Sequence, residues 1–578
     1  MMEQRNLVLT IVLSLLILLG FQYFYERPRM LQQQALQQQA AEEAEKSKPA
    51  PAARSTAEPG TPSADTLIDK AVDGERDRAT VIGEASRVKI DTPRVSGSIN
   101  LTGARLDDYT LKTYHETVDP KSPDVTLLNP LGTADAYYAE FGWSSADKSI
   151  AVPGQETHWT ADHPVLTQDQ PVSLTWDNGA GLRFIRQFSI DANFMVSVTS
   201  RVENSTQAPV TLYPYALVSR TGTPKTLGYT ILHEGVIGVT NGVLQEAKFG
   251  KIDLGAPVSQ KTTGGWLGLT DKYWLVALIP DQKASVKMSY TYAKPHGADK
   301  YQVDYLGDGE TAEPGGAIDA SQRIFAGAKE VKLLEHYRDE LSIPLFEYAV
   351  DWGWFFFLTR PIFALLDFIY SLVGNFGISI LILTVVIKAI FYPIASRSFV
   401  MMSKMKALNP KLQELKEKCG DDKVKLNQEM MALYKREKVN PVSGCLPVLL
   451  QIPVFFSLYK VLFVTIEMRH QPFYGWIRDL SAPDPTTIVN LFGLIPFDAP
   501  SFLMLGAWPL ILGVTMFFQQ RLNPQPTDPV QAKVFMFMPL VFTFMMAKFP
   551  AGLVIYYSWN NLLTILQQTL IMRRRGTA

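Results

Sequence analysis

Long uncharged apolar runs lie near the start of the chain and in its last third, whereas charged residues fill the middle. The first run, Leu7 to Tyr25, covers about 19 residues and is long enough for a helix to cross a hydrocarbon layer of roughly 30 Å. A cleaved signal peptide is the alternative, but Gly20 to Tyr23 lacks the small-x-small pattern of a cleavage site. We therefore expect residues 1–27 to form a membrane anchor.

The segment that follows, residues 28–85, is rich in Gln, Ala, Glu, Pro and Ser and holds few aromatic residues. Such a composition buries too little apolar surface to offset the entropy of folding, so we expect a disordered tether. From residue 86 to 342, short alternating runs such as Phe194 to Val198 are separated by Gly, Pro, Asn and Asp, which is typical of β-strands. We expect an antiparallel β-sandwich there, closed by a helix at Lys329 to Tyr337.

The apolar stretch within residues 343–374 contains Arg360, Pro361 and Asp367, so a membrane span there would bury two charges. We expect instead an amphipathic helix that lies at the membrane interface. Residues 375–572 should form a polytopic α-helical core of five spans, which makes six spans together with the anchor. The five are predicted at Gly377 to Ala395, Gly444 to Thr465, Ser501 to Phe518, Val534 to Phe549 and Gly552 to Ile571.

Lysine and arginine are distributed unevenly between the loops that join these spans. Residues 396–440 hold eleven of them against six acidic residues, whereas Glu467 to Thr487 holds two. By the positive-inside rule the first loop is cytosolic, and we expect it to form a hairpin of two amphipathic helices that turns at Gly420. With alternating spans, both termini and the short basic tail at 573–578 are cytosolic. The β-domain then lies on the opposite side, where a domain without disulfides is compatible with a periplasm.

Lys388 is the only charged residue in its predicted span. A charge at that depth costs about 2.5 to 3.5 kcal/mol on insertion scales. One interpretation is that the long side chain reaches the cytosolic headgroups. The other, which we favour, is a hydrated cavity inside the membrane region. No Asp or Glu occurs in the predicted spans, so water or a bound guest must compensate the charge.

Uncharged polar residues accompany Lys388. Thr384 lies one helical turn away, and the last span has polar residues at spacings of four, three and four from Tyr557 to Gln568, which places them on one helix face. Interhelical hydrogen bonding explains the same stripe, and both roles stay open. The residues that we place at the cavity are Lys388, Thr384, Gln451, Tyr556, Tyr557 and Asn561, with Thr564 and Gln568 on the same stripe.

Methionine and phenylalanine crowd the run at residues 534–549. Thioether side chains adapt to varied apolar partners, although ordinary lipid-facing packing explains the same composition. We expect an apolar surface along which a guest chain can slide, formed by Ile452, Phe455, Met538 and Met545.

Composition and motifs argue against several function classes. A net charge of −1 with 19% charged residues argues against direct binding of nucleic acid. The sequence has no P-loop, HExxH or paired-cysteine motif, so we predict no catalytic residue, no metal site and no cofactor. A secondary transporter would require internal repeats, which are not visible. A membrane-anchored carbohydrate-active enzyme would leave the helical region unexplained.

A set of short motifs runs through the last third of the chain. They are Gly374-Asn375-Phe376-Gly377, Tyr392-Pro393, Leu408-Asn409-Pro410-Lys411, Gly420-Asp421-Asp422-Lys423, Val439-Asn440-Pro441, Gln451-Ile452-Pro453, Phe549-Pro550-Ala551-Gly552-Leu553 and Tyr556-Tyr557. From about Asp351 to Arg573 the chain resembles the YidC/Oxa family of membrane protein insertases. The run from Gly265 to Trp274 resembles the Gram-negative branch, whose large periplasmic domain is a β-supersandwich.

The resemblance implies an insertase and chaperone of the bacterial inner membrane that works without ATP. Its five C-terminal spans would enclose a hydrated groove, open to the cytosol and to lipid, in which Lys388 receives the polar tail of a substrate and Thr384 and Tyr557 touch it. Relatives often have arginine in place of Lys388; lysine keeps the charge but lacks the bidentate fork. The implied hairpin residues are Lys411, Gly420, Asp421, Asp422 and Lys423.

The resemblance also implies partners. These are nascent inner-membrane proteins, the lipid bilayer, the Sec translocon and, only weakly because the basic tail is short, the ribosome.

Overall fold

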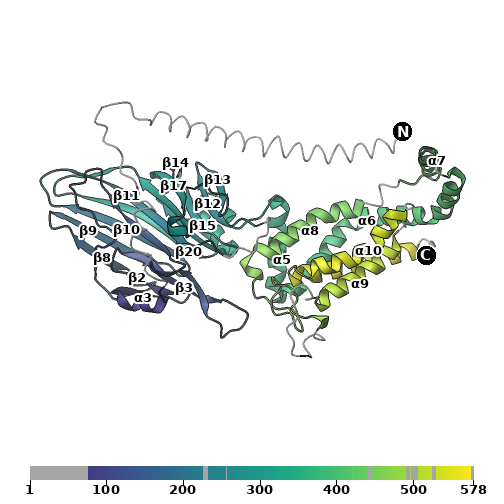
Figure 1. Cartoon of the computed structure of the whole chain (residues 1–578), viewed down its shortest axis with the longest axis horizontal. Helices are drawn as coiled ribbons and strands as arrows, with labels where there is room; N and C mark the ends of the chain where they lie inside the picture. Colours follow the sequence, from purple (N-terminus) through teal and green to yellow (C-terminus); the bar gives the residue numbers. More distant parts are fainter. Residues whose placement is uncertain are drawn as a thin grey trace. The chain divides into compact units, whose positions relative to one another are not determined.

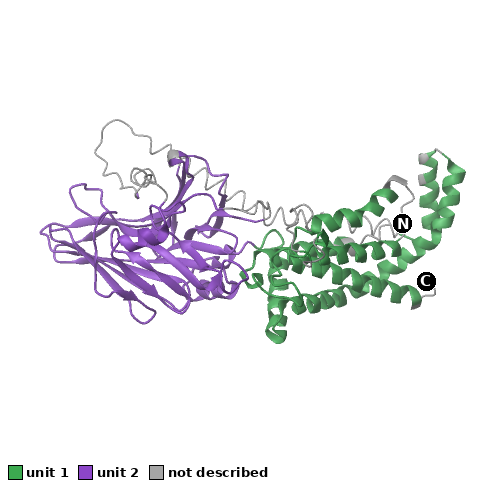
Figure 2. Cartoon of the chain, turned by 60° about the horizontal axis from the view of Figure 1, so that its bottom comes forward, with its two compact units in different colours: residues 1–33, 352–578 green, residues 34–351 purple. Residues whose placement is uncertain are grey.

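The computed structural model describes residues 61, 76–224, 232–254, 257–420, 422–440, 446–489, 495, 505–523 and 529–574. The predicted anchor, most of the predicted tether, Asp421 and residues 575–578 of the predicted tail lie outside these residues. The chain divides into two compact units (Figure 2): residues 34–351, called here the β unit, and residues 1–33 with 352–578, called here the helical unit.

The β unit contains two large sheets (Figure 1). The first has eleven strands, in the order β14 (Val258–Thr263), β17 (Ser285–Ala293), β18 (Lys300–Gly307), β11 (Val210–Thr221), β5 (Tyr137–Ser144), β3 (Arg105–His115), β2 (Val95–Asn100), β1 (Arg87–Asp91) and β7 (Val165–Leu166), with β19 (Glu310–Ala312) paired to β11 and β4 (Asp124–Leu128) paired to β3. The pairing is antiparallel except between β1 and β7.

The second sheet has nine strands. Its order is β13 (Val243–Lys248), β12 (Gly235–Thr240), β15 (Trp266–Thr270), β16 (Trp274–Pro280), β20 (Ala317–Ala328), β10 (Met195–Asn204), β9 (Leu182–Ile190), β8 (Val172–Asp177) and β6 (Thr160–Ala161). A short 3₁₀ turn, η3 (Pro295–Gly297), joins β17 to β18.

Alternating burial along the strands explains how the two sheets pack. In β9 every second residue is buried, including Phe184 and Phe188, while those between are exposed or half-buried. The ring of Phe188 meets that of Phe141 on β5, in the other sheet, at 6.4 Å between centroids. A strand whose side chains alternate in this way has one face in a core, so the predicted all-β sandwich is confirmed.

The end of the β unit lies further along the chain than predicted. The closing helix, expected at Lys329 to Tyr337, is α4 (Val331–Glu340), and a 3₁₀ turn η4 (Phe346–Ala349) follows it. Phe346 is fully buried against Trp266, with ring centroids 5.2 Å apart, and the indole of Trp266 donates a hydrogen bond to the carbonyl of Pro344. Residues 343–351 therefore belong to this core and not to an interfacial helix, because their apolar side chains pack on the sheet.

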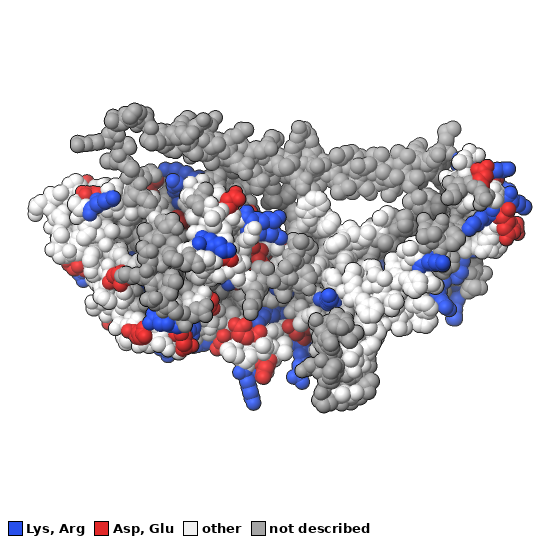
Figure 3. All heavy atoms as spheres, in the orientation of Figure 1, with Lys and Arg blue, Asp and Glu red and all other residues white. Residues whose placement is uncertain are grey.

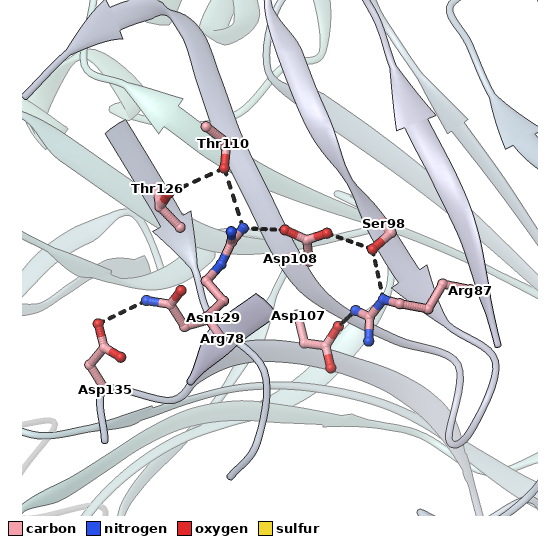
Figure 4. Close-up of polar contacts among 9 residues, drawn as sticks. All are labelled: Arg78, Arg87, Ser98, Asp107, Asp108, Thr110, Thr126, Asn129 and Asp135. Atoms are coloured by element: carbon pink, nitrogen blue, oxygen red, sulfur yellow. Dashed lines mark hydrogen bonds and ion pairs between the residues drawn. The ribbon is translucent and has the colours of Figure 1, made fainter. Parts of the chain in front are cut away.

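The beginning of the β unit also differs from expectation. Within the predicted tether, α3 (Arg78–Glu84) forms a helix capped by Asp77. Figure 4 shows how it is attached: Arg78 pairs with Asp108, whose other oxygen accepts a hydrogen bond from Ser98 at 2.5 Å. Arg78, which the composition assigned to a disordered tether, is thus held by a carboxylate of β3, and the sequence pattern did not predict this contact.

The helical unit consists of several apolar helices. They are α5 (Phe356–Val373), α6 (Phe376–Cys419), α7 (Lys423–Arg436), α8 (Leu446–Val464), the 3₁₀ turn η6 (Ile466–Met468), α9 (Ala507–Leu522), α10 (Pro529–Met546) and α11 (Ala551–Arg574). Within the described residues, α5 and α6 are long and apolar enough to cross a membrane, and Gln451–Val464 and Ala532–Met546 are shorter apolar helical stretches. Six spans with a five-helix core therefore stay a prediction, as does the interfacial position of α5.

The longest helix, α6, corrects the predicted boundary between a span ending at Ala395 and a separate hairpin helix. It runs unbroken for 44 residues through Pro393 and Pro410. It begins where Asn375 accepts a hydrogen bond from the backbone of Ile378 at 3.0 Å, and it ends at Gly420, whose φ is 54°. Proline is tolerated inside a membrane helix because neighbouring helices satisfy the backbone groups that it leaves unbonded. This explains why Pro393 and Pro410 do not end α6.

Charged side chains are concentrated at one end of the helical unit. Figure 3 shows a broad white surface over this unit, with blue lysine and arginine side chains gathered at the hairpin of α6 and α7. Large apolar side chains of α10 are exposed, among them Phe537 (55%) and Val541 (62%). Exposed apolar surface beside a charged end fits contact with lipid.

Candidate functional site

A cavity of about 390 Å³ lies in the helical unit between α6, α8, α9, α10 and α11. We call it the polar cavity. Its polar lining residues are Lys388, Gln451, Gln519, Gln520, Asn523, Tyr557, Asn560, Asn561, Thr564 and Gln568, and its apolar ones include Ile387, Phe391, Phe399, Met402, Ile452, Met516, Phe535, Met538 and Phe542.

Lys388 lies on the wall that α6 contributes. Its Nζ donates a hydrogen bond of 2.7 Å to the hydroxyl of Thr564 on α11, and that hydroxyl donates in turn to the backbone carbonyl of Asn560 at 2.6 Å. None of the described residues that line the cavity is acidic. The ammonium group is thus oriented by a neutral partner, and its charge remains available to an anion in the cavity.

The lining of α6 follows from helix geometry. Residues Lys388, Phe391, Ala395, Phe399 and Met402 recur at spacings of three and four, so they share one helix face. Since α6 continues past the expected end of the span, this face extends the cavity wall toward the hairpin.

Gln451 and the tyrosine pair join α8 to α11. The amide of Gln451 donates to the hydroxyl of Tyr556, which is fully buried and is not a lining residue. Tyr557 does line the cavity, and its ring packs edge-to-face on Phe455 at 4.9 Å between centroids. Tyr556 therefore stabilises the wall, and Tyr557 presents its ring to the interior.

Two amide side chains join α11 to α9. Asn561 donates to the hydroxyl of Thr515 at 3.3 Å, and Gln568 donates through Nε2 to the carbonyl of Leu522 at 3.3 Å. The other amide atom of Gln568, Oε1, is buried without a hydrogen-bond partner. Both amides line the cavity, so its polar face is held in place by helix packing.

The structure brings Lys388, Gln451, Tyr557 and Asn561 to one cavity, as the sequence suggested. Thr384 is not a lining residue: it is 1% exposed, and its hydroxyl donates to the carbonyl of Ile380 one turn earlier at 2.6 Å. Because the hydroxyl of Thr384 already bonds within its own helix, it needs no hydrogen bond from a substrate in the cavity.

The expected apolar surface divides in a similar way. Ile452 and Met538 line the cavity, whereas Phe455 is not a lining residue and contacts the ring of Tyr557. Met545 is 45% exposed on α10 and is not a lining residue.

The hairpin residues are stabilised by local contacts. Lys411 on α6 pairs with Glu437 at 2.9 Å, directly after α7 ends, and this ion pair links the two arms. Gly420 ends α6 with a positive φ, which glycine adopts without strain. Asp422 caps α7 by accepting hydrogen bonds from the backbone of Val424 and Lys425. Asp421 and the side chain of Lys423 lie outside the described residues.

Sequence reasoning missed the polar residues of α9. Gln519, Gln520 and Asn523 line the cavity near the end of that helix. Polar residues at the end of an apolar run usually mark the point where a helix leaves the membrane. Only their spacing relative to Met516 indicates that they share a helix face with it. Asn560 was missed because Asn561, next to it, was assigned to the stripe.

The site offers a cation, several amides and an adaptable apolar wall. No group of three or more His, Cys, Asp and Glu side chains that could hold a metal ion occurs within the part of the chain that the structure describes. The arrangement is suited to binding a polar segment that continues into an apolar one.

Comparisons with known proteins cover the whole chain. Residues 87–365 match the family model described as YidC periplasmic domain, and residues 368–577 match the one described as 60Kd inner membrane protein. A membrane protein insertase YidC of Methylobacterium sp. (strain 4-46) is 53% identical, over 99% of this chain and 96% of its own length. One from Bradyrhizobium diazoefficiens is 52% identical, over 100% and 97%. A crystal structure of an active YidC insertase with its first transmembrane domain resolved covers 83% of this chain and 92% of that one, at 17% identity and a TM-score of 0.35.

Proposed function

The chain belongs to the YidC family of membrane protein insertases, and we propose that it passes hydrophobic segments of newly made proteins into the inner membrane through its polar cavity. The segment's polar tail enters the cavity, and its apolar part moves past Ile452 and Met538 into lipid. Hydrophobic transfer drives this movement, and the membrane potential contributes about 2.3 kcal/mol per charge per 100 mV. ATP is not required, because both driving forces act on the substrate itself.

The observation that carries the proposal is the placement of Lys388. It lines the cavity and bonds to a neutral hydroxyl, and no described lining residue bears a negative charge. A cation in such a site lowers the cost of bringing a carboxylate out of water. Substrates whose translocated tails are acidic should therefore depend on it most.

The proposed orientation places the hairpin of α6 and α7 in the cytosol with both termini, and the β unit in the periplasm. The hairpin then meets substrates first as they leave the ribosome, although stable ribosome contact through the short basic tail is not expected. The cavity is too small for a folded domain. We propose that small substrates use this protein alone and that those with large translocated domains also need the Sec translocon.

The test uses the full chain, reconstituted into proteoliposomes, with one small membrane protein made in two forms. One form has an acidic translocated tail and the other has the matching amides. Replacing Lys388 with Gln should reduce insertion of the acidic form by about tenfold, equivalent to about 1.4 kcal/mol, because the attraction is lost. Protease protection of the tail measures insertion. The amide form should change by less than twofold, roughly the scatter of single-site effects.

Lys388→Arg is the matched control, since it retains the charge and should retain most of the insertion of the acidic form. Equal losses for the acidic and amide forms would contradict the proposed role of the cation. Photocrosslinking from Tyr557 during synthesis of the substrate should give an adduct, whereas the buried Thr384 should give less.

A further inference from the structure

Among the described residues that line the polar cavity, Gln568 has a buried oxygen, Oε1, without a hydrogen-bond partner. Gln568 on α11 is 1% exposed, and its Oε1 accepts no hydrogen bond. The orientation of this amide is determined by its other atom, since Nε2 donates to the carbonyl of Leu522 and an oxygen in that place would be repelled. The carbonyl oxygen of a residue that lines the cavity is therefore left without a donor.

A carbonyl oxygen binds only donors, such as a backbone N–H. Lys388 offers the opposite chemistry: its ammonium has three N–H groups and donates one of them to Thr564. The cavity thus holds a donor, Lys388 of α6, which bonds to Thr564 of α11, and an acceptor, Gln568, further along α11. A guest that satisfies both must carry an acceptor and a donor of its own.

The spacing of the two groups suggests what that guest is. Lys388 is bonded at the level of Thr564, and Gln568 lies four residues further along α11, which is about 6 Å along the helix axis. An extended chain rises about 3.3 Å per residue, so groups two residues apart lie about 7 Å apart. An extended peptide that follows α11 therefore offers a carbonyl or carboxylate to Lys388 and the N–H of the second residue beyond it to Gln568.

We propose that the polar cavity binds the substrate's polar tail as an extended backbone, with Gln568 as the residue that accepts a backbone N–H. This inference rests on the proposed function, because it assumes that substrate tails enter the cavity. A helical tail fits less well: its inner N–H and C=O groups bond to each other, and its first turn has free N–H groups but no free carbonyls. An extended segment has both kinds of group free, so it can pair with Lys388 and with Gln568 at the same time.

The experiment removes single N–H groups from the substrate. A small membrane protein is prepared by chemical synthesis with one amide at a time replaced by an ester along its translocated tail, and its insertion by the full chain in proteoliposomes is measured. With the wild-type chain, an ester at one position of the tail should lower insertion by about fivefold, which is the usual effect of losing one neutral hydrogen bond. Esters at the other positions should have little effect. That position should follow the acidic residue of the tail by two.

The protein variant Gln568→Met removes the acceptor at nearly constant shape. It should insert the all-amide substrate about fivefold less well, and the ester at the sensitive position should then have no further effect. Gln567→Met is the matched control, because Gln567 is a neighbour that does not line the cavity, and it should keep the ester sensitivity.

Several outcomes overturn the inference. A flat ester profile with the wild-type chain overturns it, and this result does not depend on how Gln568→Met folds. An ester effect that persists in Gln568→Met overturns it as well. If the profile is flat while Lys388→Gln still discriminates against acidic tails, the extended-chain inference fails and the proposed function stands. If neither variant affects insertion, the proposed function fails too.

Discussion

At the scale of single residues, a buried carboxylate in the β unit lowers the stability of the folded protein at neutral pH. Asp304 on β18 is 3% exposed and accepts hydrogen bonds from Gln302 at 3.0 Å and from Thr61 at 2.9 Å. Burial raises the pKa of Asp304 to about 6, although these hydrogen bonds and Lys287 act in the opposite direction. At neutral pH the folded protein therefore holds a largely desolvated negative charge.

The pH dependence of this cost has a definite sign. The pKa of Asp304 is about 6 in the folded protein, whereas an aspartate in water has an ordinary pKa of 3.8. The folded state therefore binds more protons between these pH values, and stability rises as pH falls through 6. Asp304→Asn should increase the free energy of unfolding by up to about 3 kcal/mol above pH 6, with no gain near pH 4. Thermal melting of the purified full chain at pH 7.5 and at about pH 4 checks this. An equal gain at both pH values would contradict it.

The candidate site was predictable in part from residue types. Lys388 was visible because a lone charge in an apolar run is rare, and Tyr557 and Asn561 because their spacing matches a helix face. Thr384 follows the same spacing but satisfies its hydroxyl within α6. The amide of Gln568 is oriented by its hydrogen bond to Leu522, at the end of α9, and this leaves its oxygen without a partner. A single sequence does not show which helices are neighbours, so this contact was not predictable.

At the scale of elements, the approach of α9 to α10 depends on one glycine. A Cβ placed on Gly513 would lie 2.2 Å from the hydroxyl oxygen of Thr543, which is 5% exposed. Small residues permit such close packing between membrane helices. Since α9 and α10 both contribute to the polar cavity, this contact helps to determine its width.

Gly513→Ala should therefore push the two helices apart and lower the free energy of unfolding by about 1 to 3 kcal/mol, as overpacking does. Thermal melting of the detergent-solubilised full chain measures the change. Thr543→Ala removes the hydroxyl and should restore most of the loss in the double variant, whereas Val514→Ala, at a residue 56% exposed, should have little effect. A double variant as unstable as Gly513→Ala alone would show that the clash is not the cause.

Element types were easier to predict than element ends. Alternation predicted the strands of the β unit, and apolar runs predicted α8 and α11. The predicted end of α6 was wrong. Pro393 and the charges after it resemble the usual signal for the end of a helix, yet this helix continues to Cys419. The helix α3 was missed because Arg78 is fixed by Asp108, a contact between residues far apart in sequence.

At the scale of the whole molecule, the division into a β unit and a helical unit follows the change from alternating to continuous apolar patterns. The position of each unit relative to the membrane is a separate question. It rests on the eleven basic residues of 396–440 and on the family to which the chain belongs. Chemical labelling from one side of the membrane decides it.

Single-cysteine labelling tests that orientation. After Cys419 and Cys445 are replaced by Ser, a cysteine at Val118 in the β unit (44% exposed) should react with a membrane-impermeant maleimide in intact spheroplasts. A cysteine at Val424 in the hairpin (68% exposed) should react only after the membrane is broken. The reverse pattern would place the hairpin outside, and the proposed route of the substrate would be wrong.

The continuity of α6 has a mechanical consequence. Lys388 and Cys419 belong to one helix and are separated by 31 residues, or about 46 Å of rise. Because both belong to one helix, a displacement of the hairpin is transmitted along α6 toward Lys388. Pro393 and Pro410 lie between these two residues, and each leaves one carbonyl of the helix without its usual donor. We therefore expect a change in the tilt of the hairpin to shift the position of the ammonium group.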